Sequence, residues 1–377
     1  MAYPAVGMIG GGQLARMAHQ AAIPLGIGFR VLAADPADSA ALVGPQVDIG
    51  APDDLDALRR FAKSCDVVTF DHEHVPPDHL RALEDDGVIL RPGPAALGHA
   101  QDKGLMRRRL TAAGLPCPRW RLVNGAAEMA DFAAEVGWPV MLKVVRGGYD
   151  GRGVWRVDSA DDAARVAADR PGVLLAEEHV AFTRELAVLV ARSPHGQTAA
   201  YPVVETVQRD GICVETVTPA PELTPARAAD AQSIALRIAG ELDVVGVLAV
   251  EMFQTPDGVL VNELAMRPHN TGHWTIDGAS TSQFEQHLRA VLDLPLGETR
   301  ATAAHVVMAN VLGGPASDPY ARFAHCMARD PGLKIHMYGK AVRPGRKIGH
   351  VTAAGVDLER TRERARRAAA YLHGDDE

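Results

Sequence analysis

The sequence predicts a protein of mixed α/β and α+β class that is divided into several domains. Its 377 residues are long for a single domain. Strand, turn, helix and strand patterns alternate near the N-terminus, as they do in α/β domains, whereas strands dominate later segments. A stretch rich in proline and glycine, residues 90–104, lies between these parts and marks the first expected domain boundary.

The composition, with 47% hydrophobic and 23% charged residues, is ordinary for a soluble globular chain. A formal net charge of -8 argues against a surface that attracts nucleic acid or anionic lipid, so we expect neither a nucleic-acid nor a membrane partner. The four cysteines show no C-x-x-C spacing, which argues against a zinc site and a disulfide framework. Neither a signal peptide nor a membrane-length apolar run is recognisable, so we expect a cytoplasmic protein.

The N-terminal elements are a buried strand, a glycine turn and a helix within residues 5–22, followed by strands within 29–36 and 65–76. The turn matches G-x-G-x-x-A, and Asp35 ends the second strand where a ribose-binding acid would lie. Three interpretations stay open: a dinucleotide site, a mononucleotide-type unit that brings the helix N-terminus close to another anion, or a tight turn with a structural role only. In "DHEHV", His72 and His74 could suggest a metal site, but His-x-His without a third ligand is more often part of an ordinary polar loop, which we expect here.

A helix is expected at residues 105–114, then strands at 139–145, 153–157 and 173–180 with a helix at 160–169. The loop "KVVRGGYDGRGV" joins two of these strands and carries four glycines. Glycines would let its backbone N–H groups approach phosphate oxygens, and Lys143 would add a positive charge. The alternative is a glycine-bearing hairpin with a solvated lysine.

Strands continue from residue 184 to 266, interrupted by a helix that starts near Pro225. "GVLAVEMFQTPDGVLVNEL" is a predicted hairpin closed by Pro-Asp-Gly. If Thr255 pairs with Val259, then Glu251 lies opposite Glu263, and the two carboxylates would repel each other unless a cation lies between them. Mg²⁺ prefers such oxygen ligands, with Asn262 nearby. The alternative is a register shifted by one residue, which leaves one carboxylate in water.

The last part of the chain contains an apolar segment at residues 303–313, a basic segment at 339–350 and an arginine-rich amphipathic helix. The basic segment, with Lys340, Arg343, Arg346 and Lys347, could bind a phosphate monoester. A charged edge strand, protected against aggregation, explains it equally well.

Together these segments resemble the ATP-grasp enzymes and, within them, the N5-carboxyaminoimidazole ribonucleotide synthetase family of purine biosynthesis. The resemblance covers nearly the whole chain and is strongest in the run "RPHNTGHWT" around Arg267 and His273. Other matching segments, in chain order, are "GGGQLARMA", "QDK", "LKVVRGGYDGRGV", "EEHVAFTRELAVLVAR", "YPVVETVQRDGI", "GVLAVEMF", "VNELAM", "TSQFEQHLRAVLDLPLG" and "GRKIGHVT".

The resemblance implies an ATP-grasp architecture: an N-terminal mononucleotide-binding-like domain at residues 1–100, an ATP-grasp domain at 101–300 with a small mobile lid at about 118–180, and a short C-terminal domain at 301–377. It also implies a carboxylating ligase. ATP would convert bicarbonate to carboxyphosphate, and the amine of 5-aminoimidazole ribonucleotide would then be carboxylated, with release of ADP and phosphate. The implied cofactor is Mg²⁺, and the implied assembly is a homodimer.

The resemblance also implies roles for individual residues. Arg267, His269 and Asn270 would face bicarbonate and carboxyphosphate, with Asp150 and Lys347 as further catalytic residues. Glu251 and Glu263 would hold Mg²⁺. ATP would be bound by Lys103, Lys143, Gly148, Tyr149, Asp150, Gly151, Arg152, Gly153, Val154, Glu177, Glu178, His179, Val180, Glu185, Gln208, Asn262 and Glu263. The ribonucleotide would be bound by Gln13, Leu14, Glu73, Tyr149, Arg152, Lys340, Arg346 and Lys347.

Three alternatives remain. Another ATP-grasp ligase, such as a formate-dependent ribonucleotide transformylase or a biotin-carboxylase-like enzyme, would keep the ATP site and change the acceptor. A dehydrogenase would rest on the N-terminal glycines and Asp35. A nucleotide sensor would bind ATP without turnover.

Overall fold

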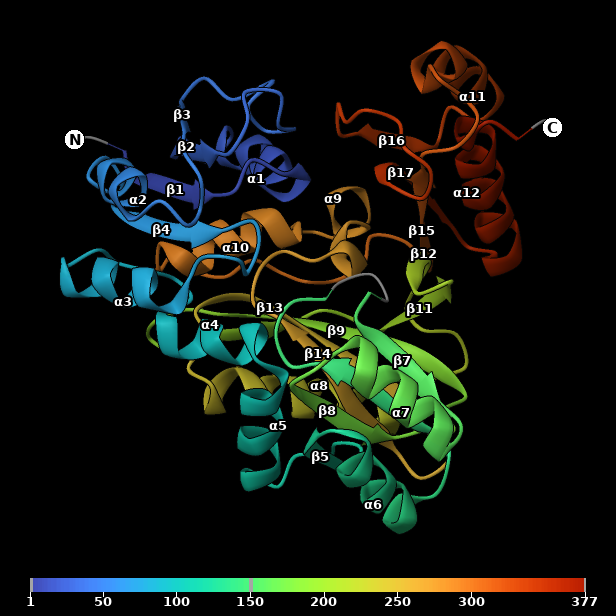
Figure 1. Ribbon diagram of the computed structural model, residues 1–377. Helices are drawn as coiled ribbons and strands as arrows, with labels where there is room; N and C mark the ends of the chain where they lie inside the picture. Colours follow the sequence, from blue (N-terminus) through green and yellow to red (C-terminus); the bar gives the residue numbers. More distant parts are fainter. Residues whose placement is uncertain (1–2, 149–151, 376–377) are drawn as a thin grey trace.

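The computed structural model describes residues 3–148 and 152–375, and within them the strands form three sheets. Figure 1 shows the N-terminal sheet in blue, a four-stranded sheet in green, and a large sheet that runs from the middle of the chain to the C-terminal unit in red. None of the described helices is both long and apolar enough to cross a membrane.

The N-terminal sheet is parallel, with the strand order β3-β2-β1-β4. This arrangement agrees with the α/β pattern expected from the sequence. Its elements are β1 (Ala5–Ile9), α1 (Gln13–Ala22), β2 (Gly28–Ala33), β3 (Val47–Ile49), α2 (Leu55–Ala62), β4 (Val67–Phe70), α3 (Pro77–Asp85) and α4 (Pro94–Gln101).

The glycine turn after β1 brings the N-terminus of α1 against a carboxylate of the protein itself. Asp71, directly after β4, accepts hydrogen bonds from the N–H groups of Gly12 at 2.6 Å and Ala15 at 3.2 Å. A Cβ at Gly12 would lie 2.2 Å from Asp71 Oδ2. The helix N-terminus, where a dinucleotide phosphate would bind, therefore already holds an anionic group. This occupancy favours the structural interpretation of the glycine turn and argues against a dehydrogenase.

A second, antiparallel sheet has the order β5-β8-β6-β7 and carries two helices. Its core contains Val123, Phe132, Leu142 and Leu174. The elements are β5 (Trp120–Asn124), α6 (Ala126–Val136), β6 (Val140–Val144), β7 (Val154–Val157), α7 (Ala160–Asp169) and β8 (Val173–Glu178), and α5 (Lys103–Ala112) precedes them.

The largest sheet is antiparallel and has the order β14-β13-β9-β11-β12-β15-β17-β16, with β10 paired to β9. Its strands are β9 (Arg184–Arg192), β10 (Thr198–Ala200), β11 (Val204–Arg209), β12 (Ile212–Thr218), β13 (Gly246–Gln254), β14 (Val259–Ala265), β15 (His305–Leu312), β16 (Lys334–Met337) and β17 (Lys347–Gly355). Its helices are α8 (Pro225–Glu241), η1 (Asn270–Gly272), α9 (Thr275–Gly278), α10 (Gln283–Val291), η2 (Pro319–Arg322), α11 (Phe323–Arg329) and α12 (Leu358–His373).

Two features of this sheet position the site. β17, which begins at Lys347, lies between β15 and β16, so the basic segment leads into an internal strand rather than an edge strand. α10 packs against α1 and also contacts β13 and β9 (Figure 1). Phe284 and Leu288 of α10 belong to the same apolar cluster as Leu14 of α1. The helix therefore joins the N-terminal sheet to the large sheet.

Candidate active site

A cleft of about 800 Å³ lies between elements of all three sheets, within the size range of small-molecule sites. Its lining brings together most of the residues expected at the ATP, metal and substrate sites. These residues are Gln13, Leu14, Glu73, Lys103, Lys143, Gly148, Val154, Glu177, Glu178, His179, Val180, Glu185, Gln208, Glu251, Asn262, Glu263, Arg267, His269, Asn270 and Lys347.

The remaining expected residues lie elsewhere or cannot be placed. Tyr149, Asp150 and Gly151 lie outside the described residues. Among the described residues, Arg152, Gly153, Lys340 and Arg346 do not line the cleft. Arg346 donates a hydrogen bond to the carbonyl of Ala341 at 3.3 Å, within the loop that precedes β17. Lys340 donates to Gln13 Oε1 and so contacts the cleft through that residue.

The hairpin β13–β14 places Glu251 and Glu263 in the cleft, but its strand register differs from the expected one. Gln254, rather than Thr255, pairs with Val259, so an uninterrupted ladder would not bring Glu251 opposite Glu263. Asn262 is an extra residue in β14, and this β-bulge shifts the register by one. Glu251 and Glu263 therefore do face each other. The turn is one residue longer than expected, and the bulge adds one residue to β14, so the two shifts cancel at Glu251 and Glu263. The sequence pattern therefore does not reveal the bulge.

The charges and burial of the Glu251–Glu263 pair favour a bound cation. Burial, followed by the nearby Glu263 and Glu185, raises the pKa of Glu251 to about 8. Glu263 accepts a hydrogen bond from Lys103 Nζ at 3.0 Å. No group of three or more His, Cys, Asp or Glu side chains suited to a metal exists among the described residues. Mg²⁺ commonly binds one or two protein carboxylates together with substrate phosphates and water, so two acids fit its requirements.

Lys143 is held at the cleft by two partners, of which Glu177 is buried. Its Nζ lies 2.9 Å from Asn262 Oδ1 and 2.7 Å from Glu177 Oε2. The other oxygen of Glu177 accepts from Arg107 Nε at 2.5 Å. Burial would raise the pKa of Glu177, but Lys143 and Arg107 lower it to about 2. The ion pairs therefore fix the Lys143 ammonium so that it projects into the cleft beside the acid pair.

A second group of polar side chains lies after the end of β14. Arg267 Nε donates to Glu73 Oε2 at 2.8 Å, which joins this segment to the loop after β4. Glu73 Oε1 and Asn270 Nδ2 are buried and have no hydrogen-bond partner among the described residues. Such groups are rare in proteins unless water or a ligand completes them. Both residues line the cleft, so a bound ligand can satisfy them.

His269 lies between this group and the acid pair. Its Nε2 is 3.9 Å from Glu251 Oε1, and its Nδ1 is 2.9 Å from Thr271 Oγ1. Burial, with a further contribution from Arg267, holds the pKa of His269 well below its usual value. The lowered pKa favours the neutral imidazole, which can donate and accept hydrogen bonds.

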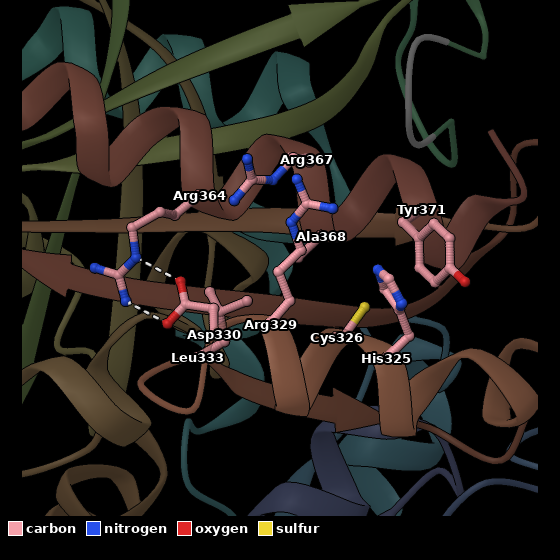
Figure 2. Close-up of a pocket in the computed structure, with 9 residues that line it drawn as sticks. All are labelled: His325, Cys326, Arg329, Asp330, Leu333, Arg364, Arg367, Ala368 and Tyr371. Atoms are coloured by element: carbon pink, nitrogen blue, oxygen red, sulfur yellow. Dashed lines mark hydrogen bonds and ion pairs between the residues drawn. The ribbon is translucent and has the colours of Figure 1, made fainter. Parts of the chain in front are cut away.

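A second, smaller cavity of about 20 Å³ lies between α11 and α12 (Figure 2). Arg364 reaches both oxygens of Asp330 there, at 2.5 and 3.0 Å. A space of this size holds about one water molecule. It cannot admit a nucleotide, so the large cleft is the candidate active site.

Three family models match the chain. The ribonucleotide synthetase preATP-grasp domain matches residues 3–101, the ATP-grasp domain matches 108–284, and the phosphoribosylaminoimidazole carboxylase C-terminal domain matches 306–364. N5-carboxyaminoimidazole ribonucleotide synthase of Mycobacterium tuberculosis is 57% identical over 98% of this chain and 88% of its own length. The chain belongs to the N5-carboxyaminoimidazole ribonucleotide synthase family. The corresponding enzyme of Corynebacterium ammoniagenes is 48% identical over 98% of this chain and 92% of its own.

Solved structures of this synthase family share the fold. The enzyme of Thermus thermophilus is 38% identical, with a TM-score of 0.88 over 98% of this chain and 99% of its own. The Aspergillus clavatus enzyme in complex with ADP and 5-aminoimidazole ribonucleotide is 35% identical, with a TM-score of 0.90 over the same shares. The ATP-grasp architecture and the family inferred from the sequence are thus confirmed.

Two buried residues beside the cleft of this synthase family member, Arg107 and Gln283, were not expected from the sequence. Arg107 holds Glu177 and also donates to the carbonyls of Val261 and Asn262, at 3.0 and 2.7 Å. Gln283 contacts the backbone of His269. Arg107 lies within the triplet "RRR", where no local pattern distinguishes a buried arginine from exposed neighbours. Only packing separates them.

Proposed function

We propose that this protein uses ATP and bicarbonate to carboxylate the exocyclic amine of 5-aminoimidazole ribonucleotide. The products are N5-carboxyaminoimidazole ribonucleotide, ADP and phosphate. ATP transfers its γ-phosphoryl group to a bicarbonate oxygen, which gives carboxyphosphate. The amine then forms an N–C bond to the carboxyl carbon, either on carboxyphosphate or on carbon dioxide released from it. Phosphate leaves, and the amine loses a proton.

The observation that carries the proposal is the single cleft in which Lys143 and the acid pair meet the Arg267–Asn270 segment. On one side, Lys143 and Lys103 supply positive charge for phosphate oxygens. On the other, the Arg267 guanidinium and Asn270 Nδ2, which has no hydrogen-bond partner within residues 3–148 and 152–375, supply donors for a small anion. Phosphoryl transfer between ATP and bicarbonate needs these two groups side by side, because both reactants are anions.

The acid pair would hold Mg²⁺, with Glu251 and Glu263 as carboxylate ligands. The ion would supply charge neutralisation for the transferring phosphoryl group. The opposed carboxylates and the raised pKa of Glu251 support this assignment, because a cation relieves both the burial cost and the repulsion.

The test of the reaction is ADP release in degassed buffer with and without bicarbonate and 5-aminoimidazole ribonucleotide. We expect ADP release coupled to formation of the carboxylated ribonucleotide only when both are present. ADP release that requires formate in place of bicarbonate would instead identify a transformylase.

The test of the metal site is Glu263→Gln. We expect kcat to fall at least about 100-fold, equivalent to about 2.7 kcal/mol, because half of the proposed carboxylate pair loses its charge. Glu298→Gln, which changes an exposed carboxylate paired with Arg300, should leave kcat unchanged. Near wild-type turnover of Glu263→Gln at low magnesium concentration would contradict the assignment.

We further propose a cytoplasmic homodimer with domains divided near residues 100 and 300, as the family resemblance implies. The family-model boundaries at residues 101, 108, 284 and 306 support the division. Sedimentation equilibrium of the purified protein tests the dimer, and cell fractionation tests the location.

A further inference from the structure

Gln283 holds the backbone of His269 through a pair of hydrogen bonds. Its Oε1 accepts from the N–H of His269 at 2.8 Å, and its Nε2 donates to the carbonyl of the same residue at 2.7 Å. The Gln283 side chain is fully buried. An amide that bonds both groups of one residue fixes where that residue lies, as a neighbouring β-strand would.

The surroundings leave Gln283 little freedom. Gln283 is the first residue of α10, whose N-cap Ser282 accepts from the N–H of Glu285 at 3.1 Å. The N–H of Gln283 itself donates to Thr275 Oγ1 at 2.8 Å. A Cβ at Gly272 would lie 2.4 Å from Gln283 Oε1, so this approach requires glycine there. The amide is therefore confined by the helix start and by the loop that it holds.

The same amide also contacts the next histidine along the loop. Gln283 Nε2 lies 3.1 Å from His273 Nδ1, and the His273 ring is buried against Phe284 at a centroid distance of 5.8 Å. Gln283 thus contacts both ends of the short segment from His269 to His273. Asn270 lies inside this segment and lines the cleft, and its buried Nδ2 has no hydrogen-bond partner in the part of the chain that the structure describes.

We infer that Gln283 is a positioning residue for the reaction: its side-chain amide sets the His269–Asn270 segment at the distance from Glu251 at which the segment can bind the small anion. This inference rests on the proposed function for its chemistry. Gln283 is not among the residues that line the cleft in the described part of the chain, so it acts through His269 and Asn270. A small displacement of groups that hold reacting atoms costs orders of magnitude in rate.

The chain contains a matched control on the same helix. Gln286 is also fully buried, its Nε2 donates to the carbonyl of Gly297 at 2.8 Å, and its Oε1 accepts from the N–H of Gly297 at 2.7 Å. Gln286 thus makes the same two hydrogen bonds to Gly297 that Gln283 makes to His269, but Gly297 does not line the cleft. Substitution at Gln286 therefore reproduces the structural cost of losing such a pair without disturbing His269.

The experiment compares Gln283→Met with Gln286→Met. We expect Gln283→Met to lower kcat by on the order of 10- to 100-fold, with KM for ATP changed less than about twofold, since Lys143 and Glu177 are untouched. Gln286→Met should keep kcat near the wild-type value. Equal kcat values for the two variants would overturn the inference.

Gln283→Glu provides a readout that a purely structural role would not give. A protonated carboxyl can donate to the His269 carbonyl and accept from its N–H, as the amide does, whereas a carboxylate repels that carbonyl. The ratio of variant to wild-type kcat should therefore rise as pH is lowered toward the acid's pKa. A ratio that is independent of pH would overturn the inference, even if Gln283→Met fails to fold.

Amide hydrogen exchange separates this inference from the proposed reaction. Exchange at the His269 N–H should be faster in Gln283→Met than in wild type, and unchanged in Gln286→Met, whatever the enzyme's substrates are. If the wild-type protein shows no bicarbonate-dependent release of ADP, the proposed carboxylation reaction is refuted. Unchanged exchange at the His269 N–H in Gln283→Met would refute the inference that Gln283 holds the backbone of His269.

Discussion

Arg107 and Glu177 show how single buried charges shape the candidate ATP site. Arg107 is fully buried, and its guanidinium bonds Glu177 and two carbonyls of β14. The arrangement joins α5, β8 and β14 at the point where Lys143 enters the cleft. Removing Arg107 would leave Lys143 as the only remaining cation beside the buried Glu177 among the described residues, and would leave two carbonyls of β14 without their donor. Breaking a buried pair in this way is costly because charge and polar groups stay buried with fewer partners.

We therefore predict that Arg107→Met lowers the free energy of unfolding by about 3 kcal/mol or more, measured by urea denaturation. Arg109→Met is the control on the same helix. Arg109 pairs with Glu241 at 2.7 Å, but its side chain is 43% exposed, so its loss should cost less than about 1 kcal/mol. Similar losses in the two variants would show that Glu177 does not depend on Arg107.

The start of α1 shows how an element can use a glycine for close approach rather than for unusual dihedral angles. Gly12 has φ -75°, which any residue adopts, yet a Cβ there would overlap the carboxylate of Asp71. Gly93, the N-cap of α4, has φ -69° and nothing within 4 Å of the corresponding Cβ position. The two glycines thus have the same role at their helices and differ in their surroundings.

We predict that Gly12→Ala destabilises the protein by about 1–3 kcal/mol more than Gly93→Ala, measured as the difference between their free energies of unfolding. The loss of an N-cap glycine is common to both variants, so the difference reports the clash with Asp71. Equal stabilities would mean that Asp71 can move away, and the helix N-terminus would then be open to an anion.

Buried histidines set the response of the whole molecule to acid. His287 joins the N-terminal sheet to the large sheet: its Nε2 lies 2.8 Å from Thr69 Oγ1, and its Nδ1 accepts from the N–H of Val247 at 3.1 Å. Burial lowers the pKa of His287 to about 3, and burial followed by the charge of Lys347 does the same for His273. Both imidazoles are neutral in the folded protein.

Because these folded-state pKa values lie below the unfolded value near 6.5, the unfolded chain binds protons first as pH falls. Stability is therefore fully present above pH 6.5 and is lost as pH falls from 6.5 toward about 3, by up to about 1.4 kcal/mol per pH unit for each histidine.

We predict that His287→Gln reduces the slope of the unfolding free energy against pH. Between pH 6.5 and 5, the reduction should approach the contribution of one bound proton, about 1.4 kcal/mol per pH unit. The measurement is urea denaturation at a series of pH values. A slope unaltered by His287→Gln would show that burial does not lower the pKa of this imidazole in the folded state.

Local patterns in the sequence predicted the N-terminal α/β unit, the strands on both sides of the glycine loop and a hairpin that carries both acids. These elements depend on residues close together in the chain, where periodicity and turn chemistry act directly. The family was indicated by the resemblance of motifs along nearly the whole chain. Only the tertiary structure decided that Asn262 forms a bulge, that β17 is internal and that Arg107 reaches Glu177. It also decided that Gln283 holds His269. Those outcomes depend on which surfaces pack together, and a contact such as Arg107–Glu177, 70 positions apart, leaves no periodic signal.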